Sequence, residues 1–217
     1  MDLSELAELR QEYTYAGLDV DDLAPDPVAQ FRRWFAAWHE VAVGDPNAMV
    51  VTTASLDGRP SVRTVLLRAL DDDGFVFFTN QDSRKGRELA ANPHAALLFP
   101  WHPLGRQVIV EGEASPLPAD ASDAYWATRP RGSQIAALAS PQSQVVADRA
   151  VLDDRWAALE AELAGRDVPR PPHWGGLRVR HERVEFWQGR ERRLHDRLVY
   201  RRDPASASAW RVERLAP

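Results

Sequence analysis

One segment of the sequence combines a helix start with two adjacent cations. Residues 78–85 read Phe-Thr-Asn-Gln-Asp-Ser-Arg-Lys, so a strand ends, a polar loop follows, and Ser83 can cap a helix. Arg84 and Lys85 then occupy the first helical turn, where the helix dipole favours acidic side chains. Free backbone N–H groups beside two cations are typical of a phosphate site. A solvated helix start is the alternative.

A second segment, residues 63–68, is an apolar strand with an arginine at each end. A buried guanidinium is costly unless it meets an anion, because it cannot lose its charge. The spacing of Arg63 and Arg68 puts their side chains on opposite faces of an ideal strand. Both can therefore serve one ligand only through a bulge, a backbone contact or a site shared between subunits. The alternative is a barrel strand whose end residues reach solvent.

Tyr125, Arg129 and Ser133 recur at helical spacing, although Pro130 predicts a break between them. We therefore expect the three side chains to converge from two short helices. Two hydroxyl groups with one arginine are typical of a phosphate-binding set. Separate capping and surface roles are the alternative.

Near the C-terminus, Arg193, His195 and Arg197 alternate along the sequence. In an extended strand they share one face, and Asp196 points to the other. A row of cationic or titratable groups suits an anionic, hydrogen-bonding ligand. The alternative is an exposed edge strand whose charged side chains prevent it from pairing with another chain.

Composition limits the class of protein. The 217 residues are 44% hydrophobic and 27% charged, which indicates a globular rather than a disordered chain. The absence of cysteine excludes disulfides, thiolate metal sites and a cysteine nucleophile. The six histidines show no metal-ligand spacing, so no metal site is expected. Of 27 Lys and Arg residues, all but Lys85 are arginine.

The ends of the chain bear on location and on nucleic-acid binding. The opening lacks the basic and apolar blocks of a secretory signal, and no apolar run approaches the roughly 18 residues that span a membrane. We expect a cytoplasmic protein. The arginine-rich C-terminal region is interleaved with acidic residues in a strand-like pattern, which argues against nucleic-acid binding.

Short strands without alternating long helices predict a mainly β protein with helices, built as an antiparallel barrel or sandwich. We expect one domain over residues 1–217, with an N-terminal helical arm over about 1–44 and a C-terminal strand extension over about 170–217. Ser4 is expected to cap the first helix, which ends near Gly17. The other expected elements are helices at 26–44, 83–91 and within 118–165, and strands at 48–55, 61–70, 75–79, 95–101, 107–114, 177–187, 198–202 and 210–214.

Taken together, these segments closely resemble the pyridoxamine 5′-phosphate oxidase family over nearly the whole chain. The most specific stretches are 63–67, 83–85, 98–101, 133–135 and 184–189 with 193–197. The resemblance implies an α+β split β-barrel homodimer that binds FMN at the subunit interface. It also implies oxidation of pyridoxamine 5′-phosphate or pyridoxine 5′-phosphate to pyridoxal 5′-phosphate, by hydride transfer to FMN and reduction of O2 to hydrogen peroxide.

The resemblance assigns residues by position. The implied catalytic residues are Arg193 and His195. The implied FMN contacts are Arg63, Thr64, Val65, Leu66, Leu67, Arg68, Phe78, Thr79, Arg84, Lys85, Gln107, Gln142, Ser143, Trp187 and Arg197. The implied substrate contacts are Arg10, Tyr13, Asp45, Arg68, Tyr125, Arg129, Ser133, Arg193, Leu194 and His195, of which Arg10, Tyr13 and Asp45 resemble residues that close the site.

Two positions depart from the family pattern. Arg68 stands where the family usually has lysine, and Phe78 where it often has tyrosine. Neither change removes a charge, so we expect modest changes in affinity. Other functions stay open: a different split-barrel FMN or deazaflavin reductase, a non-catalytic FMN or pyridoxal-phosphate carrier, and an arginine-rich nucleic-acid binder.

Overall fold

The computed structural model describes residues 12–203 and 206–217. The chain divides into two compact units. Unit 1 comprises residues 1–49, 97–111 and 182–217, and unit 2 comprises residues 50–96 and 112–181. The chain passes between the units within four strands, β1 (Ala48–Ala54), β5 (His94–Trp101), β6 (Arg106–Pro116) and β7 (Trp174–Gln188).

Unit 2 is built on an antiparallel sheet that begins with a hairpin. Its strands include β1 (Ala48–Ala54), β2 (Pro60–Leu66), β3 (Ala69–Asp71) and β4 (Gly74–Asn80). The hydrogen-bonded order is β2-β1-β5-β6-β7-β4-β3. The turn between β1 and β2 contains the Asp57-Gly58 pair, which is a strong hairpin signal, and Ser55 N–H donates to Arg59 O at 3.1 Å.

The centre of this sheet requires close backbone approach at β6. A Cβ on Gly112 would overlap the carbonyl oxygen of Arg180 on β7. We predict that Gly112→Ala lowers the free energy of unfolding by about 1–3 kcal/mol, because the backbone must move to admit the methyl group. Urea unfolding of the variant and of the unsubstituted protein measures this change in the free energy of unfolding. Gly132→Ala is the matched control, since the nearest atom there, on Trp156, is 4.0 Å away. An equal loss in both variants would contradict this reading.

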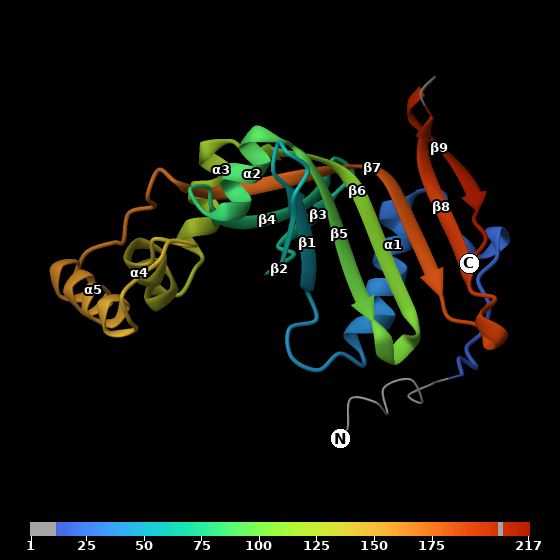
Figure 1. The fold of residues 1–217 in the computed structure, drawn as a ribbon, viewed down its shortest axis with the longest axis horizontal. Coiled ribbons are helices and arrows are strands. Elements are labelled where there is room, and N and C mark those ends of the chain that lie inside the picture. Colours follow the sequence, from blue (N-terminus) through green and yellow to red (C-terminus); the bar gives the residue numbers. More distant parts are fainter. Residues whose placement is uncertain (1–11, 204–205) are drawn as a thin grey trace. The chain divides into compact units, whose positions relative to one another are not determined.

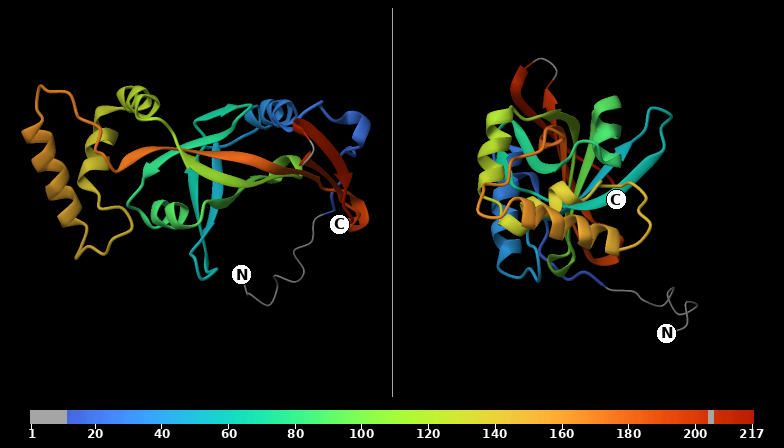
Figure 2. Two further views of the ribbon diagram at one scale, coloured as in Figure 1. Left: turned by 90° about the horizontal axis from the view of Figure 1, so that it is seen from above. Right: turned by 90° about the vertical axis from the view of Figure 1, so that its left-hand side faces the viewer.

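Four helices accompany the sheet of unit 2, namely α2 (Arg84–Ala91), α3 (Ala119–Ala127), α4 (Arg131–Ala139) and α5 (Ala150–Glu162). The α4–α5 pair is visible in yellow and orange in Figure 2. A separate apolar cluster lies among these helices, and Trp126 at its centre donates its indole N–H to Val168 O at 2.8 Å. The predicted break at Pro130 is confirmed, because this proline directly precedes α4.

Unit 1 packs one aromatic helix, α1 (Pro27–His39), against strand residues of the same unit. Asp26 caps this helix, because its carboxylate accepts the Ala29 N–H at 2.8 Å. Phe31 meets Phe99 edge-on with ring centroids 4.8 Å apart, and Trp34 and Phe186 do the same at 5.2 Å. The remaining elements are η2 (Val20–Asp22), η3 (His102–Leu104), η4 (Glu191–Arg193), β8 (Asp196–Asp203) and β9 (Ser206–Arg214).

Strand β8 pairs with both β7 and β9 in antiparallel register, and Figure 1 shows β8 and β9 side by side in red. Within the described residues, no helix has both the length and the apolar character needed to cross a membrane.

Some element boundaries differ from the expectation. The start of the first expected helix lies outside the described residues, and residues 12–19 form no helix. Helix α1 ends at His39 rather than near residue 44. The strand expected over 61–70 is broken, because β2 ends at Leu66 and β3 begins at Ala69. In the break, Arg68 N–H donates to Val76 O at 2.8 Å, so the backbone bends to reach β4.

Candidate active site

The predicted phosphate site at the start of α2 holds a buried ammonium. Ser83 caps the helix as expected, and only 7% of Lys85 is exposed. Lys85 Nζ donates to Thr79 Oγ1 at 3.1 Å and to Ser83 Oγ and Gln142 Oε1 at 3.5 Å. These acceptors are neutral. Burial, followed by the nearby Arg63 charge, lowers the pKa of Lys85 to about 8.

Two arginines flank this lysine, and one buried carboxylate holds both. Arg84 Nε donates to Glu88 Oε1 at 2.8 Å, and Arg63 Nη2 lies 3.5 Å from Glu88 Oε2. Arg63 is also fixed to β1, because its Nη1 donates to Thr53 Oγ1 at 2.7 Å. Sequence reasoning missed Glu88, although its position four residues after Arg84 on a helix was a usable signal.

The hydroxyl groups of Thr53 and Ser61 also donate to Glu88 Oε2. Burial by itself raises the pKa of Glu88, but hydrogen bonds from Ser61, Thr53 and Arg84 outweigh it and lower the pKa to about 2. Glu88 therefore stays ionised at any ordinary pH. It balances part of the positive charge at the start of α2.

We predict that Glu88→Gln lowers the free energy of unfolding at neutral pH by about 3 kcal/mol or less. Because the folded-state pKa is depressed, this stabilisation is complete above pH 4.5 and is lost as pH falls toward 2. Urea unfolding of both proteins at pH 7 and pH 3 should show the difference shrink. Glu160→Gln is the control, a helix carboxylate paired with Arg131 but 39% exposed. A constant difference across pH would contradict the assignment.

The three cations line one cavity of unit 2, with a volume of about 480 Å³. Its wall comes from the β2 strand, the start of α2 and the loop after α4, where Ser143 has a left-handed backbone with φ 71°. The predicted contacts on this wall are Arg63, Thr64, Arg84, Lys85, Gln142 and Ser143.

A second cavity of unit 2, of about 430 Å³, shares Thr64, Lys85 and Gln142 with the first. The four predicted substrate-phosphate residues all line it, namely Arg68, Tyr125, Arg129 and Ser133. Tyr125 comes from α3 and Ser133 from α4, so the two short helices converge as expected. The predicted contacts Val65, Leu66, Phe78 and Thr79 line this cavity too, whereas Leu67 is buried and lines neither.

Aromatic rings and guanidinium groups are stacked along this second cavity. Phe78 lies on Tyr125 with ring centroids 3.8 Å apart, and the Arg129 guanidinium lies 4.7 Å from the centroid of Trp174. Burial lowers the pKa of Arg129, the Tyr125 hydroxyl raises it, and the Arg68 charge lowers it. Arg129 Nε is buried with no hydrogen-bond partner among the described residues. An anion placed here would satisfy that group.

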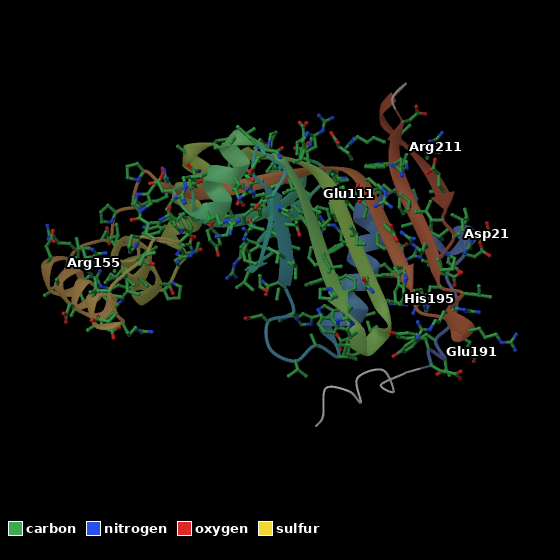
Figure 3. The ribbon with its side chains drawn as sticks, in the orientation of Figure 1. Asp21, Glu111, Arg155, Glu191, His195 and Arg211 are labelled. Atoms are coloured by element: carbon green, nitrogen blue, oxygen red, sulfur yellow. The ribbon has the colours of Figure 1, made fainter. Side chains whose placement is uncertain are left out.

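The predicted catalytic pair lies in unit 1, and its expected geometry is wrong. Arg193 ends the η4 turn rather than lying in a strand, and β8 begins only at Asp196. Arg192 and Arg193 both adopt left-handed backbone conformations, with φ 57° and 61°. Arg193, His195 and Arg197 therefore share no strand face. Figure 3 shows His195 beside this turn, with Glu191 on it.

His195 lies in a small aromatic cluster. Its ring centroid is 4.7 Å from that of Trp187 and 5.7 Å from that of Tyr13. Its Nδ1 accepts the Arg190 N–H at 3.1 Å, which leaves Nε2 as the other hydrogen-bonding atom. Burial, followed by the Arg193 charge, lowers the pKa of His195, and the Asp196 charge opposes this.

Arg197 is held by a carboxylate that sequence reasoning also missed. Its Nε donates to Glu185 Oε1 at 2.7 Å and its Nη2 to Oε2 at 3.1 Å. Glu185 is 2% exposed and also accepts Arg183 Nη2 at 2.6 Å. Glu185 lies in the 184–189 stretch that carries the family resemblance, but a strand pattern does not predict that its carboxylate is buried against Arg197.

The other predicted residues of unit 1 are dispersed. Gln107 is half-buried on β6, Asp45 is exposed in the loop after α1, and Leu194 is 68% exposed. Arg10 lies outside the described residues. The structure thus brings most of the predicted residues together in two groups, one in each unit, and leaves Gln107 and Asp45 apart from them.

Comparison with known proteins identifies the family. The family model "Pyridoxamine 5'-phosphate oxidase" matches residues 37–162, and the "Pyridoxine 5'-phosphate oxidase C-terminal dimerisation region" matches residues 174–217. The chain belongs to the pyridoxamine 5′-phosphate oxidase family. The mainly β, split-barrel fold class expected from the sequence is confirmed.

Family relatives match along nearly their whole length. Two proteins named pyridoxine/pyridoxamine 5′-phosphate oxidase are similar to this chain. One, from Rubrobacter xylanophilus, is 57% identical over 98% of this chain and 97% of its own. The other, from Nocardioides sp., is 56% identical over 98% of both chains.

Two solved structures are also similar. PhzG from Burkholderia lata, in complex with tetrahydrophenazine-1-carboxylic acid, has a TM-score of 0.86 and 35% identity, and covers 94% of this chain and 100% of its own. A pyridoxamine 5′-phosphate oxidase-related, FMN binding protein from Nostoc punctiforme shares the fold, with a TM-score of 0.70 and 16% identity over 90% of this chain and 100% of its own.

The residues of unit 2 fit the phosphate-bearing flavin that the pyridoxamine 5′-phosphate oxidase family implies. Lys85 is buried against neutral acceptors, so its charge suits an anion in the first cavity. The unpartnered Nε of Arg129 suits a second anion. With three cations against Glu88, the start of α2 carries a net charge that complements a phosphate dianion.

Proposed function

We propose that the protein oxidises pyridoxamine 5′-phosphate or pyridoxine 5′-phosphate to pyridoxal 5′-phosphate, with FMN as cofactor and O2 as acceptor. The observation that carries the proposal is the pair of adjoining cationic cavities in unit 2, which share Lys85. Two neighbouring anion sites suit a cofactor phosphate next to a substrate phosphate. The identity to named oxidases supports the same reading.

Within this proposal each group of residues has a distinct task. Arg63, Arg84 and Lys85 hold the cofactor phosphate, and the set of Arg129 with Ser133 holds the substrate phosphate. When bound, the isoalloxazine supplies the redox chemistry by accepting a hydride and passing electrons to O2. Binding the remote phosphate tightly keeps the reacting carbon of the substrate in a productive pose.

The two implied catalytic residues act on the substrate ring in this proposal. Arg193 positions the ring, and His195 contributes a hydrogen bond through Nε2, since its Nδ1 accepts the Arg190 N–H. The match of residues 174–217 to a dimerisation region supports a homodimer, in which the FMN sites lie at the subunit interface.

The test is flavin reduction by substrate. The purified protein should be yellow, lose its colour when pyridoxine 5′-phosphate or pyridoxamine 5′-phosphate is added without oxygen, and form hydrogen peroxide and pyridoxal 5′-phosphate in air. Colour without bleaching would favour a different split-barrel reductase or a carrier. A colourless protein retained on DNA with steep salt dependence would favour nucleic-acid binding.

A second candidate function follows from the similarity to PhzG, whose structure holds tetrahydrophenazine-1-carboxylic acid. In this reading the protein oxidises a reduced phenazine carboxylate, and the arginines of the second cavity bind a carboxylate instead of a phosphate. The same anaerobic assay separates the two, because the physiological substrate should reduce the flavin with the higher second-order rate constant.

A further inference from the structure

The N-terminal segment of unit 1, residues 12–19, is held in place without regular secondary structure. In Figure 1 it is the blue stretch that passes the base of β8. Leu18 is 6% exposed, and its N–H donates to Asp196 Oδ2 at 3.0 Å. Three residues before Leu18 in the sequence, Tyr15 Oη donates to Pro103 O at 3.1 Å. We call residues 12–19 the arm.

Asp196 and Arg214 together satisfy both backbone groups of Leu18. The Asp196 carboxylate accepts the Leu18 N–H on one oxygen and Arg214 Nη1 on the other, at 2.7 Å. The second guanidinium nitrogen of Arg214 donates to Leu18 O at 3.2 Å and to Asp19 Oδ1 at 2.9 Å. Charge-assisted hydrogen bonds of this kind are stronger than neutral ones. The contacts that Asp196 and Arg214 make with the arm are therefore concentrated on Leu18 and Asp19.

Tyr13 lies five residues before Leu18, against the residues around His195. Its ring is edge-on to Trp187, with centroids 5.8 Å apart, and edge-on to His195. It also packs on the backbone of Gly189, where an added Cβ would lie 2.6 Å from the Tyr13 ring. Asp196 directly follows His195 in the chain, so the same short segment of β8 anchors the arm and carries the histidine.

We propose that Asp196 and Arg214 are positioning residues that lock the arm onto the His195 turn, so that Tyr13 forms a fixed wall of the site there. The inference deepens the proposed function, on which its kinetic part rests. The arm has no helix or strand of its own to hold it. Loss of either charged partner should therefore loosen Leu18 and with it the contact between Tyr13 and His195, although Tyr15 keeps its hydrogen bond to Pro103 O.

The test compares Asp196→Asn and Arg214→Gln with Arg211→Gln in the full-length, flavin-loaded protein. Asparagine keeps one acceptor oxygen but lacks the negative charge and the second oxygen, whereas Asp196 uses one oxygen for the Leu18 N–H and the other for Arg214. Arg211 lies on the same strand, β9, pairs with Glu213 at 2.6 Å, and in Figure 3 lies toward the other end of the strand from His195. It is the matched control, since it loses one guanidinium and one ion pair without touching the arm.

Two measurements are needed. Hydrogen–deuterium exchange read by mass spectrometry should show peptides of residues 12–19 exchanging about tenfold faster in both test variants and unchanged in Arg211→Gln. Steady-state kinetics should show KM for pyridoxine 5′-phosphate rising about tenfold, with kcat changed much less, because the arm shapes the binding site rather than the reaction. Arg214→Lys should restore part of the protection, since an ammonium reaches one of the acceptors.

Each outcome is decisive. Unchanged exchange of the arm in both test variants would overturn the proposal, whatever the activity. A freed arm with unchanged KM would also overturn it, because the pair would then have only a structural role. If neither pyridoxine 5′-phosphate nor pyridoxamine 5′-phosphate reduces the flavin of the unsubstituted protein, the proposed function fails. The exchange result still decides whether Asp196 and Arg214 hold the arm.

Discussion

Arg193→Leu is expected to lower kcat by about a hundredfold or more while the protein keeps its flavin. The guanidinium lies at the end of the η4 turn, two residues before His195, in the unit that does not carry Lys85. Its loss should therefore affect the substrate ring and leave the predicted phosphate contacts of the cofactor in place. Rapid-mixing measurement of flavin bleaching gives the rate, and the absorbance ratio of flavin to protein gives retention.

The matched control is Arg192→Leu, because Arg192 carries the same charge, is also exposed and has a similar positive φ. Both variants therefore remove one charge from the turn and place leucine at a position with a left-handed backbone. Similar losses in both would show that the turn, rather than the Arg193 side chain, matters. Full turnover in Arg193→Leu would show that its assigned role is wrong.

The same variant has a spectroscopic signature. The Arg193 charge contributes to the lowered pKa of His195, so its removal should raise that pKa toward the ordinary value. A proton NMR titration of the His195 ring in Arg193→Leu and Arg192→Leu would reveal the shift. The sign is fixed by the geometry, since a neighbouring cation always disfavours the imidazolium.

Lys85→Ala is expected to raise the dissociation constant for FMN by about 10- to 100-fold, the effect of losing one hydrogen-bonded charge. Lys85 is the buried cation at the start of α2 whose hydrogen-bond acceptors are all neutral. Titration of the flavin-free protein with FMN, followed by quenching of flavin fluorescence, gives the constant. Arg87→Ala is the control, because Arg87 lies on the same helix, is exposed and lines neither cavity.

The pH dependence of FMN binding shows whether Lys85 acts through the charge of its ammonium group or through the shape of its side chain. The pKa of Lys85 is about 8, so the ammonium is present below that pH and is lost above it. FMN affinity should therefore fall as pH rises from 7 to 9.5, and this decrease should disappear in Lys85→Ala. An equal decrease in both proteins would mean that another group titrates.

Local sequence signals predicted much of unit 2. The Asp57-Gly58 turn, the Ser83 cap and the break at Pro130 each depend on one or two residues with strong backbone preferences, and the structure contains all three. The convergence of Tyr125 with Ser133 followed from that break. Where a residue type has a strong preference for one backbone conformation, the sequence alone predicts the local structure.

Other features depend on partners distant in the sequence. Arginine has no preference for a left-handed backbone, so nothing at Arg193 predicts the η4 turn. Glu185 and Arg197 meet because β7 and β8 pair, with Trp187 opposite Arg197 in the register. The strand break before Arg68 likewise follows from its bond to β4. Such features cannot be predicted until the pairing of the strands in the sheet is known.

The contact between Tyr13 and Gly189 has an evolutionary consequence. Gly189 has no left-handed backbone of its own, so its lack of a side chain is required by the aromatic ring that lies against it. The two positions should therefore vary together among homologues, with larger residues at 189 tolerated only where position 13 has lost its ring. Aligned sequences alone could then show which relatives keep the arm docked.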